Sequence, residues 1–296
     1  MEFIRDIHAR KAAAGQPVVS FEFFPPKTEE GDRTLLEKTI PALKALQPDY
    51  CSVTYGAGGG TREKTLMIVD RIQREHGLTA VCHLTCVNAT AEELRGVLLE
   101  ARRLGVKNIL ALRGDPPGGN SPFTRTAGGF EYSYQLVRFI KEMGGFGIGT
   151  AGFPEGHIAC REGREADWDH LKNKIDSGAD FVLTQLFFNN ADFFRFRDYL
   201  RKKGVTVPIC PGIIPIMSAG QIKRFTTLCG AALPAPLLAS LDKYIDDDEG
   251  CAEFGIEYAT RQCAELLREG VPGLHFYTLN KVRSTAAVVR NLNLAH

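Results

Sequence analysis

Eight short hydrophobic runs are spaced along the whole chain, and each is followed by a stretch with helical periodicity. The runs cover residues 18–24, 50–55, 80–85, 108–112, 147–153, 181–188, 207–216 and 274–279. Eight repeats of strand and helix are typical of a closed (β/α)8 barrel, the TIM barrel. Because such barrels carry their reactive groups at the C-terminal ends of the strands, we expect one mouth to be lined by Glu22, Thr54, His83, Arg113, Asp115, Gln185 and Tyr277.

The predicted strands are apolar throughout rather than alternating, as expected when both faces of a parallel sheet are buried. At 296 residues the chain is somewhat longer than a typical barrel of about 250 residues, which favours one catalytic domain over 1–296 with extra helices. Two helical stretches, 234–245 and 252–268, break the rhythm before the last strand. We interpret the first as a helical insertion at about 229–250. The acidic run 246–249 is then a solvated helix N-terminus, where negative charge is favourable.

Charge and composition exclude several classes of partner. A net charge of +1 gives no reason to expect a nucleic acid or an anionic membrane as partner. There is no apolar run long enough for a transmembrane helix, and residues 1–15 predict a short amphipathic helix rather than a signal peptide. The eight cysteines are scattered and include no Cys-x-x-Cys pair, so we expect reduced thiols and a cytoplasmic protein.

No metal site is predicted. Cys82, His83 and Cys86 come nearest to a metal cluster, but strand alternation points the two thiols to one face and the imidazole to the other. An ordinary packed strand is therefore favoured over a metal site there. The acidic run 246–249 also lacks further ligands close in sequence.

Glu22 is the most unusual candidate, because it lies in Ser-Phe-Glu-Phe-Phe-Pro-Pro between phenylalanines. A carboxylate in an apolar setting is costly unless it is protonated or paired. We expect burial to raise the pKa of Glu22, which suits a general acid. The alternative is a structural ion pair with an arginine of a neighbouring strand.

Three further motifs lie within or directly after predicted strands and could contact a ligand. Residues 113–117, Arg-Gly-Asp-Pro-Pro, combine a glycine that permits close backbone approach with a proline-braced carboxylate; an internal Arg–Asp pair is the alternative. The glycine-rich stretch 56–61 could hold a phosphate or be a mobile loop, and it is not a dinucleotide-binding fingerprint. Gln185 places an amide within an apolar strand, where it must find a hydrogen-bond partner in the backbone or in a heteroaromatic ligand. His157 and Lys174 could meet phosphate or be ordinary surface groups.

Acyl transfer and metal-dependent hydrolysis rank low, because the chain contains neither Gly-x-Ser-x-Gly nor His-Glu-x-x-His. The residues alone therefore predict a barrel enzyme that uses acid catalysis on a heteroaromatic substrate.

An ordered set of motifs then indicates a family. The segments are SFEFFPPK, SVTYGAGG, HLTC, ALRGDPP, FPEGH, EADWDHLKNKIDSGADFVLTQLFF, PGIIPI and HFYTLNK. Together they closely resemble the methylenetetrahydrofolate reductase family, whose fold is a (β/α)8 barrel. The chain resembles the short bacterial form, which has the catalytic barrel without a regulatory domain.

The resemblance implies a flavoenzyme in which NADH or NADPH reduces FAD and leaves, and methylenetetrahydrofolate then binds in its place and is reduced to the methyl form. This ping-pong scheme would supply methyl groups for methionine synthesis. Glu22 matches the general acid, Asp115 the carboxylate that holds the pterin, and Gln185 the amide shared by pterin and nicotinamide. The resemblance further implies folate contacts at Gln221, Phe225, Tyr277 and Lys281.

By the same matching, flavin contacts fall on Thr54, Tyr55, Ala57, His83, Arg113, Gly114, Asp115, Ser133, Phe153, His157, Asp167, His170 and Lys174. Three departures from the family pattern stand out. Phe153 replaces a common tyrosine, residues 157–160 read His-Ile-Ala-Cys instead of His-Pro-Glu-Ala, and Lys281 replaces an arginine. Lysine keeps the positive charge but cannot donate two parallel hydrogen bonds to a carboxylate. We therefore expect altered binding of the folate glutamate tail.

Other functions stay open at this point. A flavin-free reductase would pass hydride directly from NADH to folate, and a folate-binding subunit would have lost catalysis. A partner subunit could supply electrons. The family resemblance also leads us to expect a homo-oligomer, while the preference between NADH and NADPH is left open.

Overall fold

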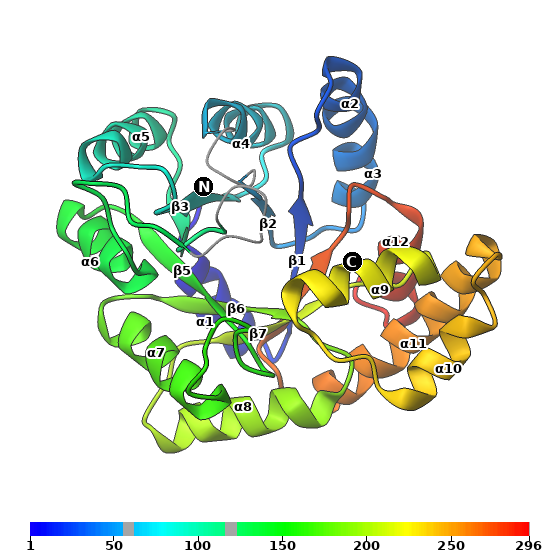
Figure 1. Ribbon diagram of the computed structural model, residues 1–296. Coiled ribbons are helices and arrows are strands. Elements are labelled where there is room, and N and C mark those ends of the chain that lie inside the picture. Colours follow the sequence, from blue (N-terminus) through cyan, green and yellow to red (C-terminus); the bar gives the residue numbers. More distant parts are fainter. Residues whose placement is uncertain (56–61, 116–122, 296) are drawn as a thin grey trace.

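The computed structural model describes residues 1–55, 62–115 and 123–295. Within these ranges the strands form one closed parallel barrel in chain order, and β8 pairs with β1. The strands are β1 (Val18–Phe23), β2 (Tyr50–Val53), β3 (Ala80–Thr85), β4 (Asn108–Leu112), β5 (Gly147–Gly152), β6 (Phe181–Leu186), β7 (Ile209–Ile213) and β8 (Gly273–Tyr277). Figure 1 shows the helices as a ring around them. The predicted TIM barrel is confirmed.

Each predicted strand is present, and several end earlier than the hydrophobic run. β1 stops at Phe23, just before Phe24 and the pair Pro25 and Pro26. Proline has no N–H to donate to a sheet, and it also restricts the residue before it. The residues that follow the strand ends are therefore free to form the loops of the mouth.

The helices that follow the strands form the outer layer. They are α2 (Glu29–Thr34), the π-helical η1 (Leu35–Thr39), α3 (Ile40–Lys44), α4 (Arg62–His76), α5 (Ala91–Arg103), α6 (Ser133–Met143), α7 (Arg164–Asp176), α8 (Asn190–Lys202), α9 (Ala219–Cys229), α10 (Ala235–Asp242), α11 (Asp248–Arg268) and α12 (Arg283–Asn291). In α5, for example, Thr90 and Glu93 form a reciprocal capping box, and Leu94 and Leu98 are buried toward the sheet.

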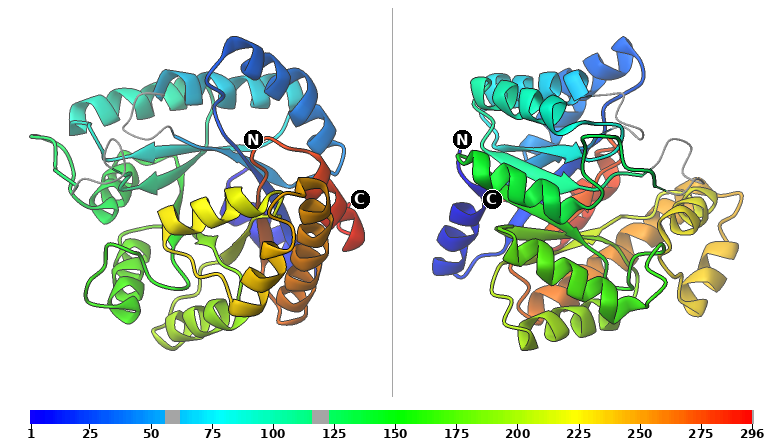
Figure 2. Two further views of the ribbon diagram at one scale, coloured as in Figure 1. Left: turned by 45° about the vertical axis from the view of Figure 1, so that its right-hand side comes forward. Right: turned by 60° about the vertical axis from the view of Figure 1, so that its left-hand side comes forward.

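The first helix, α1 (Ile4–Ala13), closes the N-terminal end of the barrel. Ile4 and Ile7 are fully buried in an inner apolar cluster with Tyr50 and Phe181. The Ile4 backbone N–H donates to Asn108 Oδ1 at 3.0 Å, which fixes the helix start on β4. The right-hand view of Figure 2 shows α1 at the end of the molecule opposite α9. This apolar cluster and α1 fill the N-terminal end of the barrel. A ligand must therefore enter at the C-terminal end of the strands.

The helices before the last strand agree with the interpretation of the acidic run. α10 lies between α9 and α11, and Asp247 Oδ1 caps α11 by accepting from the Gly250 N–H at 2.9 Å. Asp248 and Glu249 occupy the first turn of α11, where they face the positive end of the helix dipole. The run is thus a helix start, as predicted.

The barrel interior is more polar than the sequence predicts. Along β1, Phe21 and Phe23 pack in the large cluster between sheet and helices, whereas Ser20 and Glu22 alternate with them and contact side chains of other strands. The prediction of strands that are apolar on both faces is therefore wrong for the upper layers of this barrel. These inward polar positions build the site.

Across the described ranges, every helix is either too short or too polar to span a bilayer.

Candidate active site

Glu22 lies near the C-terminal end of β1, buried inside the barrel with 5% of its surface exposed. Ser52 Oγ of β2 donates to Glu22 Oε2 at 3.2 Å, and His275 Nε2 of β8 lies 3.3 Å from the same oxygen. His83 Nε2 of β3 lies 3.4 Å from it without hydrogen-bond alignment. Three neighbouring strands thus converge on one carboxylate oxygen. Among the described residues, Glu22 contacts two histidines and not an arginine, so the alternative of an Arg–Glu ion pair is not what the structure has.

The pKa of Glu22 differs from the prediction. Burial raises the pKa, but hydrogen bonding and charge from His275 and His83 outweigh burial and lower it to about 2. The predicted rise is therefore wrong, because sequence reasoning counted the phenylalanines and not the imidazoles. Glu22 is ionised at neutral pH here.

A hydrogen-bonded chain leads away from Glu22 into the barrel. Ser20 Oγ lies 2.8 Å from His275 Nδ1, and the opposite ring nitrogen of His275 faces Glu22. When Ser20 donates to Nδ1, the Nε2–H is free to donate to the carboxylate, which satisfies all three groups. The Thr278 Oγ1 hydroxyl donates to the Glu22 backbone carbonyl at 2.7 Å and fixes the strand beneath it.

Sequence reasoning missed His275, Ser20 and Ser52. His275 is fully buried, and it stands two positions before Tyr277 on β8, while Ser20 stands two before Glu22 on β1. The period of two along a strand could have found both, and the register pairs Ser20 with His275 directly.

Tyr277 and Gln185 lie on the same side of the mouth, on β8 and β6. The Tyr277 hydroxyl donates to the Thr184 carbonyl at 2.6 Å. Burial, with a smaller contribution from the nearby Glu22 charge, raises the pKa of Tyr277 well above its usual value. Gln185 is partly exposed, and its Oε1 accepts from the Leu186 N–H at 2.9 Å. The amide NH₂ of Gln185 is the part left to meet a ligand.

Arg113, Gly114 and Asp115 follow β4 at the rim. Gly114 has φ +82°, and a Cβ there would lie 2.8 Å from Val87 Cγ1. Glycine is therefore required at this turn both by backbone conformation and by space. The turn leaves Asp115 exposed, and the Arg113 guanidinium lies over the Phe123 ring, 5.2 Å from its centroid.

The loop after β5 and the start of α7 place further charged groups near Arg113. Burial lowers the pKa of His157, and the charge of Arg113 lowers it further. The carboxylates of Asp167 and Asp115 act in the opposite direction but do not outweigh burial. Lys174 Nζ donates to the Ala151 carbonyl at 2.7 Å, and burial lowers its pKa to about 8. These groups form one polar patch at the mouth.

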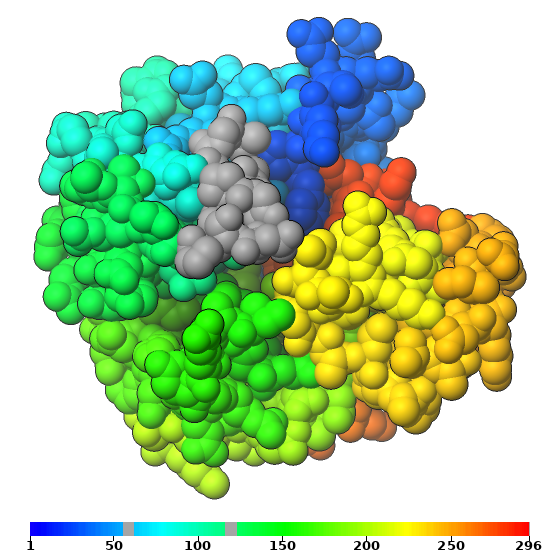
Figure 3. Space-filling model, viewed as in Figure 1, coloured from blue at the N-terminus to red at the C-terminus, as the bar shows by residue number. Residues whose placement is uncertain are grey.

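Aromatic contacts hold this loop in place. The rings of Phe153 and His157 meet edge-on with centroids 4.6 Å apart, and Trp168 Nε1 donates to the Phe153 carbonyl at 2.9 Å. Burial raises the pKa of Asp167, even though Lys174 and His157 favour its charged form. Figure 3 views the mouth with this green segment below it and the yellow α9 beside it.

The other predicted flavin contacts follow β2 and begin α6. Thr54 and Tyr55 follow β2 and are half-buried, and the Tyr55 hydroxyl accepts from Arg62 Nε. Ser133 begins α6, which starts beside Cys86 at the end of β3. Ala57 and the glycine-rich stretch 56–61 lie outside the described residues, as do Pro116 and Pro117.

The predicted folate contacts on α9 and after β8 lie on a third side. Phe225 is half-buried and packs with the apolar cluster that includes Ile222 and Tyr277. Gln221 and Lys281 are exposed and line one cavity of about 490 Å³. The mouth thus combines a buried carboxylate, an amide, an aromatic ring and a cationic patch. Such a set can hold an anionic, partly aromatic ligand and move one proton.

Comparison with known proteins agrees with this arrangement. Residues 7–293 match the family described as methylenetetrahydrofolate reductase. The Arabidopsis thaliana protein named methylenetetrahydrofolate reductase (NADH) 1 is 40% identical over 290 residues, which cover 95% of this chain and 49% of the plant protein. The chain therefore spans about half the length of that plant relative.

The Escherichia coli K12 protein named 5,10-methylenetetrahydrofolate reductase is 39% identical over 281 residues, which cover 95% of this chain and 92% of the bacterial protein. A solved Clostridium thermocellum structure has the same fold, with TM-score 0.61 and 15% identity over 97% of this chain and 98% of that one; it is described as binding two copies of 5-methyl-5,6,7,8-tetrahydrofolic acid. With a family match over nearly its whole length, the chain belongs to the methylenetetrahydrofolate reductase family.

Proposed function

We propose that the protein reduces 5,10-methylenetetrahydrofolate to 5-methyltetrahydrofolate with NADH or NADPH, using FAD in a ping-pong cycle. The observation that carries the proposal is the buried carboxylate of Glu22 at the mouth of a barrel of this family, held by His275 and Ser52. The bacterial relative of nearly equal length carries the name of this activity. No ordinary nucleophile is needed, because the cofactor performs the redox chemistry.

The residues present fit FAD. His83 Nε2 is buried and lies 3.4 Å from Glu22 Oε2 without an aligned hydrogen bond, so a small turn of the ring would let it meet a ligand at the same place. The cationic groups Arg113 and Lys174 suit a diphosphate, and the half-buried Asp167 suits ribose hydroxyls. We infer that these residues hold the cofactor, together with Thr54 and Tyr55 after β2 and Ser133 at the start of α6.

Bound FAD would supply the two-electron transfer between the nicotinamide and the folate. The chain would supply binding and protons. Glu22 would protonate a nitrogen of the methylene bridge, so that the bridge opens to an iminium ion. Because His275 and His83 hold the pKa of Glu22 low, Glu22 must take a proton from solvent before the folate covers it, and burial under the folate would then favour the protonated form. His275, bonded in turn to Ser20, would keep the carboxylate oriented.

Other residues would orient the ligands. The Gln185 amide and the Asp115 carboxylate would bond the pterin edge, and Gln185 would serve the nicotinamide in the other half-reaction. Phe225 would stack on the bound ring, and Gln221 with Lys281 would hold the glutamate tail in the cavity they share. A common binding place for both ligands is what a ping-pong cycle requires.

An anaerobic absorbance titration tests the function directly. Purified protein with FAD is titrated first with NADH or NADPH and then with methylenetetrahydrofolate. We expect the flavin band to bleach with one nicotinamide and to return with the folate. Bleaching that needs an added protein fraction would indicate an electron-donating partner.

Two results would contradict the proposal. Failure to bind FAD, with folate still reduced, would favour the flavin-free reductase. Failure to bind FAD, with folate bound but not reduced, would favour the non-catalytic folate-binding subunit.

The pKa of Lys174 predicts how FAD affinity depends on pH. A lysine whose pKa is about 8 is charged below that pH and neutral above it, so FAD should bind more weakly as pH rises through about 8. Loss of one charge-assisted contact, about 1.5–3 kcal/mol, should make Lys174→Met bind FAD about 10- to 100-fold more weakly near neutral pH. Fluorescence titration at several pH values measures both effects.

Lys172→Met is the matched control, because Lys172 lies on the same helix and pairs with Asp176 at 2.9 Å. This variant should keep the wild-type affinity and its pH dependence. The assignment of Lys174 is wrong if Lys174→Met still shows the alkaline loss of affinity.

The side chain at position 281 should affect how tightly the folate glutamate tail is bound. Arginine offers two parallel donors to a carboxylate, whereas lysine acts as a point charge. For an exposed pair worth about 0.4–1 kcal/mol, Lys281→Arg should bind the folate about two- to fivefold more tightly, and Lys281→Met should bind it more weakly. Folate dissociation constants measure this, and an unchanged affinity in Lys281→Arg would remove Lys281 from the tail site.

A further inference from the structure

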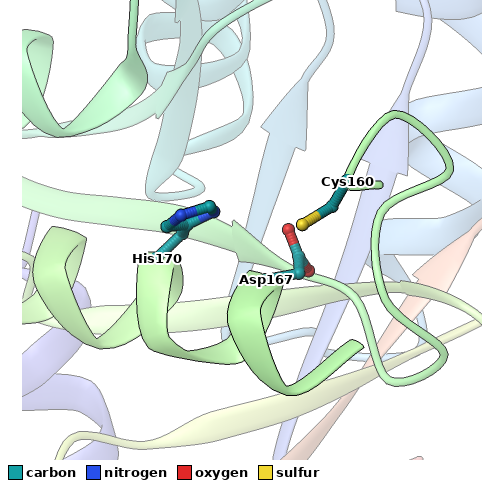
Figure 4. Close-up of side chains that lie close together, drawn as sticks. All are labelled: Cys160, Asp167 and His170. Atoms are coloured by element: carbon teal, nitrogen blue, oxygen red, sulfur yellow. The ribbon is translucent and has the colours of Figure 1, made fainter. Parts of the chain in front are cut away.

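Three side chains with different ligand atoms lie together where the loop that follows β5 meets the start of α7. Single ligand atoms of Cys160, Asp167 and His170 all lie within 4.8 Å of one another. Figure 4 shows the Cys160 thiol reaching from the loop toward Asp167, with His170 one turn further along α7. The cluster combines one sulfur, one oxygen and one nitrogen donor.

Local structure explains why these residues meet. Backbone bonds from Gly156 to Phe153 at 2.9 Å and from Cys160 to His157 at 2.8 Å fold the loop back on itself. The loop then delivers Cys160 to the first turns of α7. Asp167 and His170 are three residues apart on that helix, so their side chains project from one face.

Cys160 and His170 make few contacts of their own with the part of the chain that the structure describes. The Cys160 thiol makes only long contacts of 3.5 Å, to Glu162 Oε2 and to the Gly163 carbonyl. The Asp167 carboxylate is half-buried and lies within reach of the thiol. His170 is exposed, so its ring can turn without disturbing the core.

The geometry suits one type of ion. Zinc binds cysteine sulfur at about 2.3 Å and histidine nitrogen or carboxylate oxygen at about 2.0–2.2 Å, so its ligand atoms lie roughly 3.5 Å apart. Side-chain rotation alone covers the difference from the present spacing. A mixed sulfur, nitrogen and oxygen set favours zinc-class ions over magnesium or calcium, which prefer oxygen ligands.

We propose that Cys160, Asp167 and His170 form a binding site for a divalent transition-metal ion of the zinc class. Water, or the Glu162 carboxylate beside the thiol, completes the tetrahedral coordination. The thiol loses its proton when the metal–sulfur bond forms, and the proton passes to solvent. The resemblance also assigns Asp167 and His170 to flavin binding, so the ion and the flavin would compete for these two side chains, and Cys160, in place of the usual alanine, adds the third ligand.

The test is a metal titration of the chelator-treated protein without substrates, done both before and after removal of FAD and read by competition with a chromophoric zinc chelator. We expect one equivalent of Zn²⁺ per chain. Substitution with Co²⁺ should give a thiolate-to-cobalt charge-transfer band. Cys160→Ala and His170→Ala should each weaken Zn²⁺ binding by at least about tenfold and remove or shift that band.

Cys229→Ala is the matched control. All eight cysteines fall within the described ranges, and Cys160 and Cys229 are the two that are not buried. Cys229→Ala should keep the wild-type affinity and spectrum, and melting temperatures should verify that every variant folds. The proposal is overturned if the wild type binds no stoichiometric Zn²⁺, if Cys160→Ala binds it as tightly as the wild type, or if bound Co²⁺ shows no thiolate band.

Discussion

Glu22→Gln is expected to slow the reduction of methylenetetrahydrofolate by about 10²- to 10⁴-fold, which is the usual contribution of a general acid. Glutamine keeps the shape of the side chain and can still contact Ser52 and His275, but it cannot release a proton. Reduction of the flavin by NADH or NADPH needs no proton from Glu22, so that half-reaction should keep nearly its wild-type rate. Stopped-flow absorbance resolves the two half-reactions.

Glu75→Gln serves as the control, because Glu75 pairs with Arg71 on the exposed side of α4. It should leave both half-reactions unchanged. Equal slowing of both half-reactions in Glu22→Gln would mean that Glu22 holds the flavin and does not act as the acid. A fully active variant would remove Glu22 from catalysis.

Phe181→Ala should cost about 3–5 kcal/mol of unfolding free energy, the largest stability effect we expect. Phe181 is fully buried in the inner cluster at the closed end of the barrel, where its ring meets Tyr50 edge-on with centroids 6.5 Å apart. Removing the ring leaves a cavity among side chains of several strands, which relax little in a closed sheet. Urea-induced unfolding measures the cost.

Gly149 allows a sharper test of the same packing. A Cβ at Gly149 would lie 2.4 Å from Phe181 Cζ, so Gly149→Ala alone should destabilise the protein by overpacking, by about 1–3 kcal/mol. In the double variant the added methyl enters the space left by the ring. The two costs should therefore sum to more than the cost of the double variant. Strict additivity would show that the two residues do not share one packing site.

The barrel itself could be predicted from the sequence, because each hydrophobic run ends in glycine, proline or polar residues and is followed by a helical stretch. The strand ends were less predictable. In β1 the hydrophobic run continues to Phe24, but regular pairing ends at Phe23 before the two prolines. Hydrophobicity reports burial, whereas strand length depends on backbone hydrogen bonds.

The site was predictable only in part. Glu22 stands out because a carboxylate among phenylalanines is rare, but His275 and Ser20 look like ordinary residues of buried strands. Their importance depends on the closure of β8 onto β1, which joins residues 255 positions apart in the chain. The direction of the pKa shift of Glu22 depended on the same closure, so the flanking sequence alone predicted the wrong sign.

The pairing of β8 with β1 also makes the surroundings of Glu22 depend on closure of the barrel. The carboxylate of Glu22 is made near the start of the chain, and its partner His275 belongs to the last strand. Until that strand leaves the ribosome and docks, the barrel has an open seam and Glu22 has no imidazole from β8 beside it. In a chain without β8, Glu22 would lack the imidazole that does most to lower its pKa, so the ionisation of this carboxylate depends on closure of the barrel.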